Sequence, residues 1–164
     1  MSDEVSEGLE FQERFKPTSF HIAVLILRLV LGAAFLEAGL DKLINGFSAV
    51  GYLQHGTGPF AGWFASLASN IGIINGLAIW GEILIGIALI LGVLVRFSSF
   101  AAALMMLLYY LPYLPPSTGW ITQHIIYIFA FVILMLSGSG YFFGLDMLAK
   151  QLEQRRHPLR ILLG

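Results

Sequence analysis

The sequence predicts an all-α integral membrane protein, a four-helix bundle with an amphipathic interfacial segment between its first and second spans. The chain of 164 residues is 57% hydrophobic and 12% charged, with a mean hydropathy of +0.80, whereas ordinary soluble domains are about 25% charged. Four long apolar stretches cover most of it, at 21–44, 71–95, 97–113 and 120–143. Because one span needs about 20 apolar residues, four spans leave no room for a second folded domain.

The four spans are expected to form one transmembrane domain over residues 20–147, between an acidic tail at 1–19 and a basic tail at 148–164. The acidic tail lacks the basic n-region of a cleavable signal peptide, so the first span is expected to remain as an anchor. Cytoplasmic loops are enriched in basic residues. Those on one side of a four-span topology are Arg14, Lys16, Arg96, Lys150, Arg155, Arg156 and Arg160, and only Lys42 lies on the other. We therefore expect a multi-pass protein of a prokaryotic cell membrane with both termini in the cytoplasm.

The segment between the first two spans contains a short amphipathic pattern. Phe60, Trp63, Phe64 and Leu67 recur at i, i+3, i+4 and i+7, the spacing of a helix with one apolar face. The Gly-Thr-Gly-Pro run at 56–59 divides the segment into two pieces. Because tryptophan favours the headgroup level of a bilayer, the segment is either a connector seated at the interface or a lid over the outer mouth of the bundle. The sequence favours the connector.

Composition removes several chemistries. The chain has no cysteine, which excludes thiol–disulfide chemistry, thiolate metal sites and covalent haem attachment. A net charge of −1, without a basic run interleaved with aromatics, gives no indication of nucleic-acid binding. No second histidine follows His124 at i+3 or i+4, so the sequence predicts no metal or haem site in this chain.

The candidate functional residues are the ionisable side chains inside the spans. A charge near the bilayer centre costs about 2.5–3.5 kcal/mol on insertion scales, so each needs a partner, a wet cavity or a function. The first span contains Arg28, Glu37 and Asp41. At about 100° per residue, Glu37 lies on the face opposite Arg28 and shares a face with Asp41. This helix is therefore either buried on two sides or in contact with another chain, and we expect a homo-oligomer or a partner subunit.

The second span offers a partner for Arg28. Counted at about 1.5 Å per residue from the cytoplasmic helix ends, Arg28 lies roughly 10 Å deep and Glu82 roughly 20 Å deep, a gap that a long guanidinium side chain partly closes. The sequence thus predicts an Arg28–Glu82 ion pair. Such a pair either fixes helix packing or takes part in proton or substrate handling.

A second group of polar residues is expected near the outer face. Glu37 and His124 have similar depths, and Tyr109, Tyr110 and Tyr113 end the third span. A quinone headgroup needs donors to its carbonyl oxygens, an aromatic wall and a proton route, and this group could supply all three. The alternative for His124 is an interfacial histidine hydrogen-bonded to a neighbouring helix.

An ordered set of residues resembles the DoxX/DoxD family of small four-helix membrane proteins. The resemblance covers residues 22–147 and rests on Arg28, Gly32, Phe35, Gly39 and Lys42, on Gly81, Glu82, Gly86, Leu89, Gly92 and Arg96, and on Ser137-Gly138-Ser139-Gly140 with Leu145 and Asp146. It implies a subunit like those of thiosulfate:quinone oxidoreductase, in which DoxD-type members take part. That enzyme oxidises thiosulfate to tetrathionate and reduces membrane quinone. The family was first associated with archaeal terminal quinol oxidases, and other members have no settled activity.

The residues and the resemblance together imply a membrane subunit of a quinone-linked respiratory oxidoreductase or terminal-oxidase complex. Quinone is its expected cofactor, and lipid, other membrane subunits or a second copy of the chain are its expected partners. Thiosulfate is a dianion that needs converging cations, and the outer side carries only Lys42, which argues against a thiosulfate site formed by this chain alone. The alternative is a non-catalytic structural or accessory subunit whose charges lock its helices and dock it against catalytic partners. A transporter is less favoured, because the chain shows no internal repeat.

Each candidate residue has an expected role. Glu37, Glu82 and His124 are the candidate catalytic residues, which would handle protons or the quinone headgroup. Arg28 would keep Glu82 ionised, and Lys42 would balance Asp41. The expected quinone- or substrate-binding residues are Lys42, Asp41, Tyr110 and Trp63.

Overall fold

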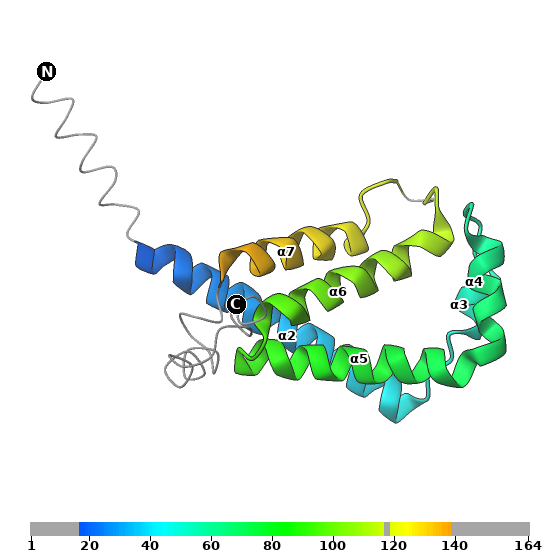
Figure 1. The fold of residues 1–164 in the computed structure, drawn as a ribbon, viewed down its shortest axis with the longest axis horizontal. Helices are drawn as coiled ribbons and strands as arrows, with labels where there is room; N and C mark the ends of the chain where they lie inside the picture. Colours follow the sequence, from blue (N-terminus) through cyan, green and yellow to red (C-terminus); the bar gives the residue numbers. More distant parts are fainter. Residues whose placement is uncertain (1–16, 117–118, 139–164) are drawn as a thin grey trace, which may run out of the picture.

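The computed structural model describes residues 17–116 and 119–138, so the predicted basic tail and most of the predicted acidic tail lie outside the described residues. The regular structure of the described part is entirely helical (Figure 1). The long helices are α2 (Pro17–Asn45), α5 (Ile71–Leu91), α6 (Val95–Tyr110) and α7 (Gln123–Ser137). The short elements are α3 (Val50–Gln54), α4 (Ala61–Leu67), η1 (Ala68–Asn70) and η2 (Leu111–Tyr113).

Three helical runs are long and apolar enough to cross a bilayer, and they extend over Ser19–Asn45, Ala61–Leu91 and Val95–Tyr113. The fourth, α7, is an apolar helix of 15 residues, which corresponds to about 22 Å at 1.5 Å per residue. The sequence of predicted span four continues to residue 143, beyond the described part. The predicted all-α membrane bundle is confirmed.

The long helices run in alternating directions. α2 packs chiefly against α5, and α6 packs chiefly against α7. The start of α2, the α5–α6 turn and the end of α7 lie at one end of the bundle, whereas α3 and α4 lie at the other, which we call the α3–α4 end (Figure 1). The tight α5–α6 turn depends on Gly92, whose φ of 68° is left-handed and therefore suits a residue without a Cβ.

Glycines set the register between α2 and α5. A Cβ at Gly39 would lie 2.7 Å from Ile83 Cγ1, and a Cβ at Gly86 would lie 2.6 Å from the backbone nitrogen of Leu36. Small residues allow membrane helices to approach this closely. In antiparallel helices, the facing pairs Gly39–Ile83 and Leu36–Gly86 belong to one register, so a shift of either helix would separate both.

The α3–α4 segment is a folded cap. α4 confirms the predicted amphipathic helix, since Phe64 is 3% exposed and Trp63 is 56% exposed, and the predicted break at 56–59 separates α3 from α4. Hydrogen bonds attach the cap to the bundle just before α3 and again between α3 and α4. The backbone N–H of Ala49 donates to Asn75 Oδ1 of α5 at 2.9 Å, and the N–H groups of Thr57 and Gly58 donate to the carbonyl oxygen of Pro112 at 2.9 and 3.0 Å.

Candidate functional site

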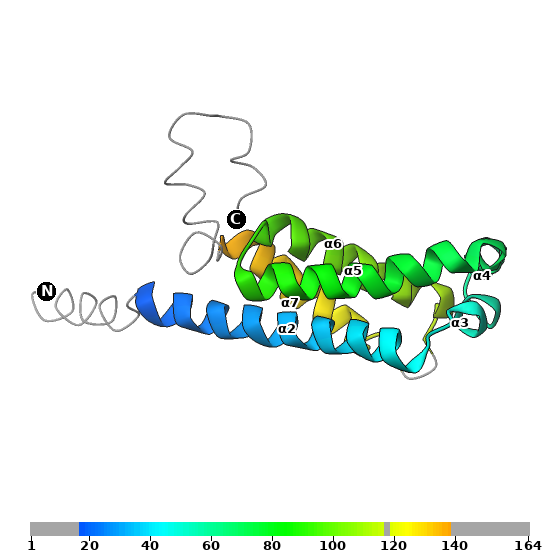
Figure 2. The same ribbon diagram turned by 90° about the horizontal axis from the view of Figure 1, so that it is seen from below.

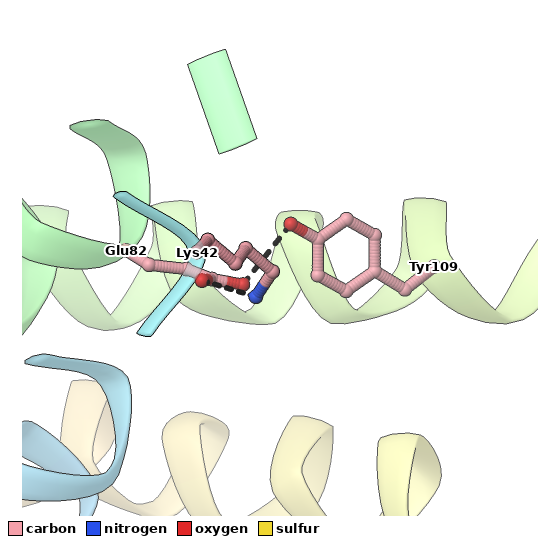
Figure 3. Close-up of polar contacts among 3 residues, drawn as sticks. All are labelled: Lys42, Glu82 and Tyr109. Atoms are coloured by element: carbon pink, nitrogen blue, oxygen red, sulfur yellow. Dashed lines mark hydrogen bonds and ion pairs between the residues drawn. The ribbon is translucent and has the colours of Figure 1, made fainter. Parts of the chain in front are cut away.

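Three side chains from three long helices meet toward the α3–α4 end of the bundle. Lys42 Nζ of α2 lies 2.5 Å from Glu82 Oε2 of α5, and the hydroxyl of Tyr109 of α6 donates to Glu82 Oε1 at 3.1 Å (Figure 3). The side chain of Glu82 is 3% exposed and that of Lys42 is 19% exposed. A buried carboxylate is tolerated when it is paired and hydrogen-bonded, and here both carboxylate oxygens are engaged. We call these three residues the ion-pair cluster.

The predicted Arg28–Glu82 ion pair is wrong, because the glycine register between α2 and α5 places Arg28 level with Leu94. Leu94 lies in the α5–α6 turn, beyond the end of α5, and Glu82 precedes the last residue of α5 by nine positions, which is about 14 Å along the helix axis. The prediction treated the cytoplasmic helix ends as level. Figure 2 shows instead that the first turns of α2 continue past the α5–α6 turn.

The predicted balance between Lys42 and Asp41 is also wrong. Lys42 points inward to Glu82, whereas the exposed Asp41 accepts a hydrogen bond from Asn45 Nδ2 at 2.7 Å. The physical reason is helical geometry, because consecutive residues are about 100° apart around the axis and cannot share a face.

Arg28 and Glu37 lie on opposite faces of α2, as predicted. Arg28 is 2% exposed inside the bundle, and Glu37 is exposed on the outer surface of α2. The inward face of α2 at this level includes Phe35, Ala38 and Lys42. Glu37 therefore lines neither cavity described below, and the predicted grouping of Glu37 with His124 is wrong.

A cavity of about 820 Å³ adjoins the ion-pair cluster, with α3 and α4 over it and residues of all four long helices in its walls. Its apolar walls include Phe35, Leu53, Phe64, Ile74, Ile85 and Met106. Its polar side chains include Lys42, Glu82, Tyr109, Tyr52, Gln123, His124 and Tyr127. Trp63, one of the predicted binding residues, also contributes to the wall. The cap thus forms part of the cavity and is more than an interfacial connector.

A second cavity of about 430 Å³ lies next to the first. The structure brings His124 together there with the three tyrosines of the predicted polar-aromatic group, Tyr109, Tyr110 and Tyr113. The ring of His124 stands edge-on to that of Tyr109, with centroids 6.5 Å apart. Four residues line both cavities, namely Tyr52, Tyr109, Gln123 and His124. Tyr109 therefore connects the ion-pair cluster with the smaller, tyrosine-rich cavity.

Tyr52 of α3 is a site residue that the sequence analysis missed. Its ring centroid lies 4.8 Å from that of Tyr113 and 6.3 Å from that of Tyr109. Burial, and secondly the proximity of Tyr113, raise the pKa of Tyr52 to about 12, so its phenol is neutral at physiological pH. In residues 17–116 and 119–138, no three histidine or acidic side chains gather in a metal-binding arrangement.

The fold and the site define a class of protein, a small four-helix membrane bundle that encloses a cavity with a buried ion pair. The model of the DoxX family matches residues 23–112, more than half of the 164 residues, and the chain belongs to this family. The matched region includes the whole ion-pair cluster, whereas α7 and His124 lie after it. No curated protein and no solved structure matches the chain.

Proposed function

We propose that this chain is the quinone-binding membrane subunit of a respiratory oxidoreductase or terminal-oxidase complex. The supporting observation is the cavity of about 820 Å³ whose apolar walls meet the ion-pair cluster. Small-molecule sites are typically clefts of about 300–1,000 Å³ with mostly apolar walls and a few polar groups that fix orientation. A quinone has the matching form, because an apolar tail carries a headgroup with two carbonyl oxygens.

The larger cavity opens on the surface that faces the lipid. Leu77 of α5 and Leu104 and Leu108 of α6 line the cavity, and these residues are 64%, 45% and 40% exposed. These residues place a mouth between α5 and α6. A molecule dissolved in the bilayer can therefore reach the cavity sideways, without passing through water.

In this proposal, the residues of the ion-pair cluster hold and protonate the headgroup. Reduction of a quinone to a quinol takes up two electrons and two protons. The Tyr109 hydroxyl, which donates to Glu82, lies where it can turn to a headgroup carbonyl, and Lys42 balances the charge of Glu82. His124 and Tyr110 line the adjoining smaller cavity, which provides the proton route. Another subunit supplies the electrons.

We further propose that the protein lies in a prokaryotic plasma membrane. The end of the bundle where α2 begins and α7 ends then faces the cytoplasm. The asymmetric distribution of Lys and Arg supports this orientation. The α3–α4 end, with both cavities beside it, then faces outward, so protons for the quinone exchange with the outer aqueous phase through the tyrosine-rich cavity.

The test is a binding titration of the purified protein in lipid nanodiscs with short-chain ubiquinone and menaquinone analogues. Trp63 lines the cavity, so quenching of its fluorescence reports binding, with Trp63→Phe as the optical control. Tyr109→Phe removes one hydrogen bond, which contributes about 0.5–1.5 kcal/mol, and should weaken binding by about 2- to 10-fold. Tyr110→Phe, which changes only the smaller cavity, should have less effect. Absence of saturable quenching by both analogues would overturn the proposal.

A second candidate function, a structural subunit without catalytic residues, is supported by Glu37. Its exposed carboxylate on the membrane-facing surface of α2 serves no cavity and suits contact with another chain. Turnover and assembly separate the two functions in the native membrane. The structural function predicts that Glu82→Gln and His124→Ala lower the yield of assembled complex and leave turnover per complex intact. The quinone-binding function predicts that turnover falls in complexes that still assemble.

A further inference from the structure

An acidic side chain interrupts the apolar outer face of α2. The exposed residues of this face recur every three or four positions and are Ile26, Val30, Ala33, Glu37, Leu40 and Ile44. Asp41, one turn after Glu37, is exposed as well. Asp41 accepts a hydrogen bond from Asn45, but within residues 17–116 and 119–138 no side chain forms a hydrogen bond or ion pair with Glu37. We call this surface the Glu37 face.

Glu37 lies within the candidate membrane span of α2, about two turns before the helix ends. It precedes Asn45, the last residue of α2, by eight positions, which is about 12 Å along the helix axis. Its neighbours along this face are the apolar Ala33 and Leu40 and, one turn further on, the acidic Asp41. Hydrocarbon disfavours a carboxylate at this position, whereas a basic side chain or hydrogen-bond donor on an adjacent helix would stabilise it.

Residues 17–116 and 119–138 of a second copy present no available cation to Glu37. The cations of these residues are Arg28, Lys42 and Arg96. Lys42 is engaged with Glu82, and Arg28 is 2% exposed. Arg96 lies in the first turn of α6, at the opposite end of the bundle. In a symmetric dimer through this face, Glu37 and Asp41 would meet carboxylates of the same sign, which is unfavourable.

We propose that the Glu37 face docks a transmembrane helix of a different protein chain, one that presents a lysine or arginine at the depth of Glu37. The partner is defined by charge complementarity, because an ion pair in hydrocarbon is weakly screened and disfavours partners that lack the cation. The apolar residues on both sides of Glu37 supply the packing surface. This interaction requires no ligand in the cavity and stands independently of quinone binding.

The experiment measures association with designed helices in lipid vesicles. The full-length protein carries a donor fluorophore, and acceptor-labelled polyleucine helices carry one lysine, one glutamate or only leucine at the depth of Glu37. Wild-type protein should bind the lysine helix about tenfold more tightly than the leucine helix. Glu37→Gln should remove this preference, Glu37→Asp should keep it, and Glu37→Lys should transfer it to the glutamate helix.

Asp41→Asn is the matched control, because it neutralises the neighbouring carboxylate, which has a partner of its own, and should keep the preference for the lysine helix. Circular dichroism and resistance to thermal unfolding verify that each variant is folded. Equal binding of the lysine and leucine helices by folded wild-type protein would overturn the proposal. Self-association that depends on Glu37 would overturn it as well, since the face would then serve a second copy.

Discussion

The ion-pair cluster predicts that replacing its two charged residues lowers the free energy of unfolding by unequal amounts. Lys42→Met leaves the Glu82 carboxylate, whose side chain is 3% exposed, with the Tyr109 hydroxyl as its one remaining hydrogen-bond partner among residues 17–116 and 119–138. Removing one partner of a buried ion pair costs about 3–5 kcal/mol, because the remaining charge is stranded in a low dielectric. Glu82→Gln leaves Lys42, whose side chain is 19% exposed near the end of α2 and can extend toward the interface. That substitution should cost less, about 1–3 kcal/mol.

Thermal unfolding of the protein in nanodiscs measures this difference. With about 2–4 °C per kcal/mol for a chain of this size, Lys42→Met should lower Tm by roughly 6–20 °C. In the double variant Lys42→Met/Glu82→Gln no stranded charge remains, so its Tm should approach that of Glu82→Gln alone. Glu37→Gln is the control and should change Tm little, because this carboxylate forms no hydrogen bond or ion pair with the part of the chain that the structure describes. Strictly additive losses in the double variant would refute the reasoning.

Three further predictions concern α5 and the cap. Gly86→Ala should lower the free energy of unfolding by about 1–3 kcal/mol, because its Cβ would lie 2.6 Å from the backbone of α2. A Cβ at Gly76 would have no atom within 4 Å, so Gly76→Ala should be neutral or stabilising in the same unfolding assay. Gly81→Leu should reduce quinone-analogue binding, since a Cβ would lie 2.6 Å from Met105 Cε in the cavity wall, and Met105→Ala should restore part of it. The pKa of Tyr52 is raised to about 12 in the folded protein, from 10.0. Its contribution to the free energy of unfolding is therefore complete below about pH 10 and is lost as the pH rises through 12. Tyr52→Phe should flatten this alkaline decline in Tm.

The sequence predicted correctly those features that depend on a single helix. The bilayer requires every backbone polar group to be satisfied internally, so long apolar runs predict the spans directly. The opposite faces of Arg28 and Glu37 follow from the rotation per residue within α2 and were predicted correctly. The same applies to the amphipathic helix that contains Phe64, because its apolar residues recur at helical spacing.

Contacts between helices required information that composition and periodicity do not contain. The partner of Glu82 depends on the axial offset of α2 against α5, and equal helix ends were the wrong assumption. The glycines carried a usable signal, because aligning Gly39 with Ile83 and Leu36 with Gly86 brings Lys42, and not Arg28, near Glu82. Tyr52 had no such signal. It reaches the site from a helix of five residues, whose position depends on hydrogen bonds to α5 and η2 formed only in the folded bundle.

The two proposals divide the function of α2 between its two faces. Lys42 reaches inward to the cavity, and Glu37 faces the surrounding membrane. Because the faces are separate, Tyr109→Phe should weaken quinone binding without changing association with the lysine helix. Glu37→Gln should remove the preference for the lysine helix without changing quinone binding. If either variant changed both readouts, the faces would be coupled through α2, and docking of a cationic helix would then alter the ion-pair cluster itself.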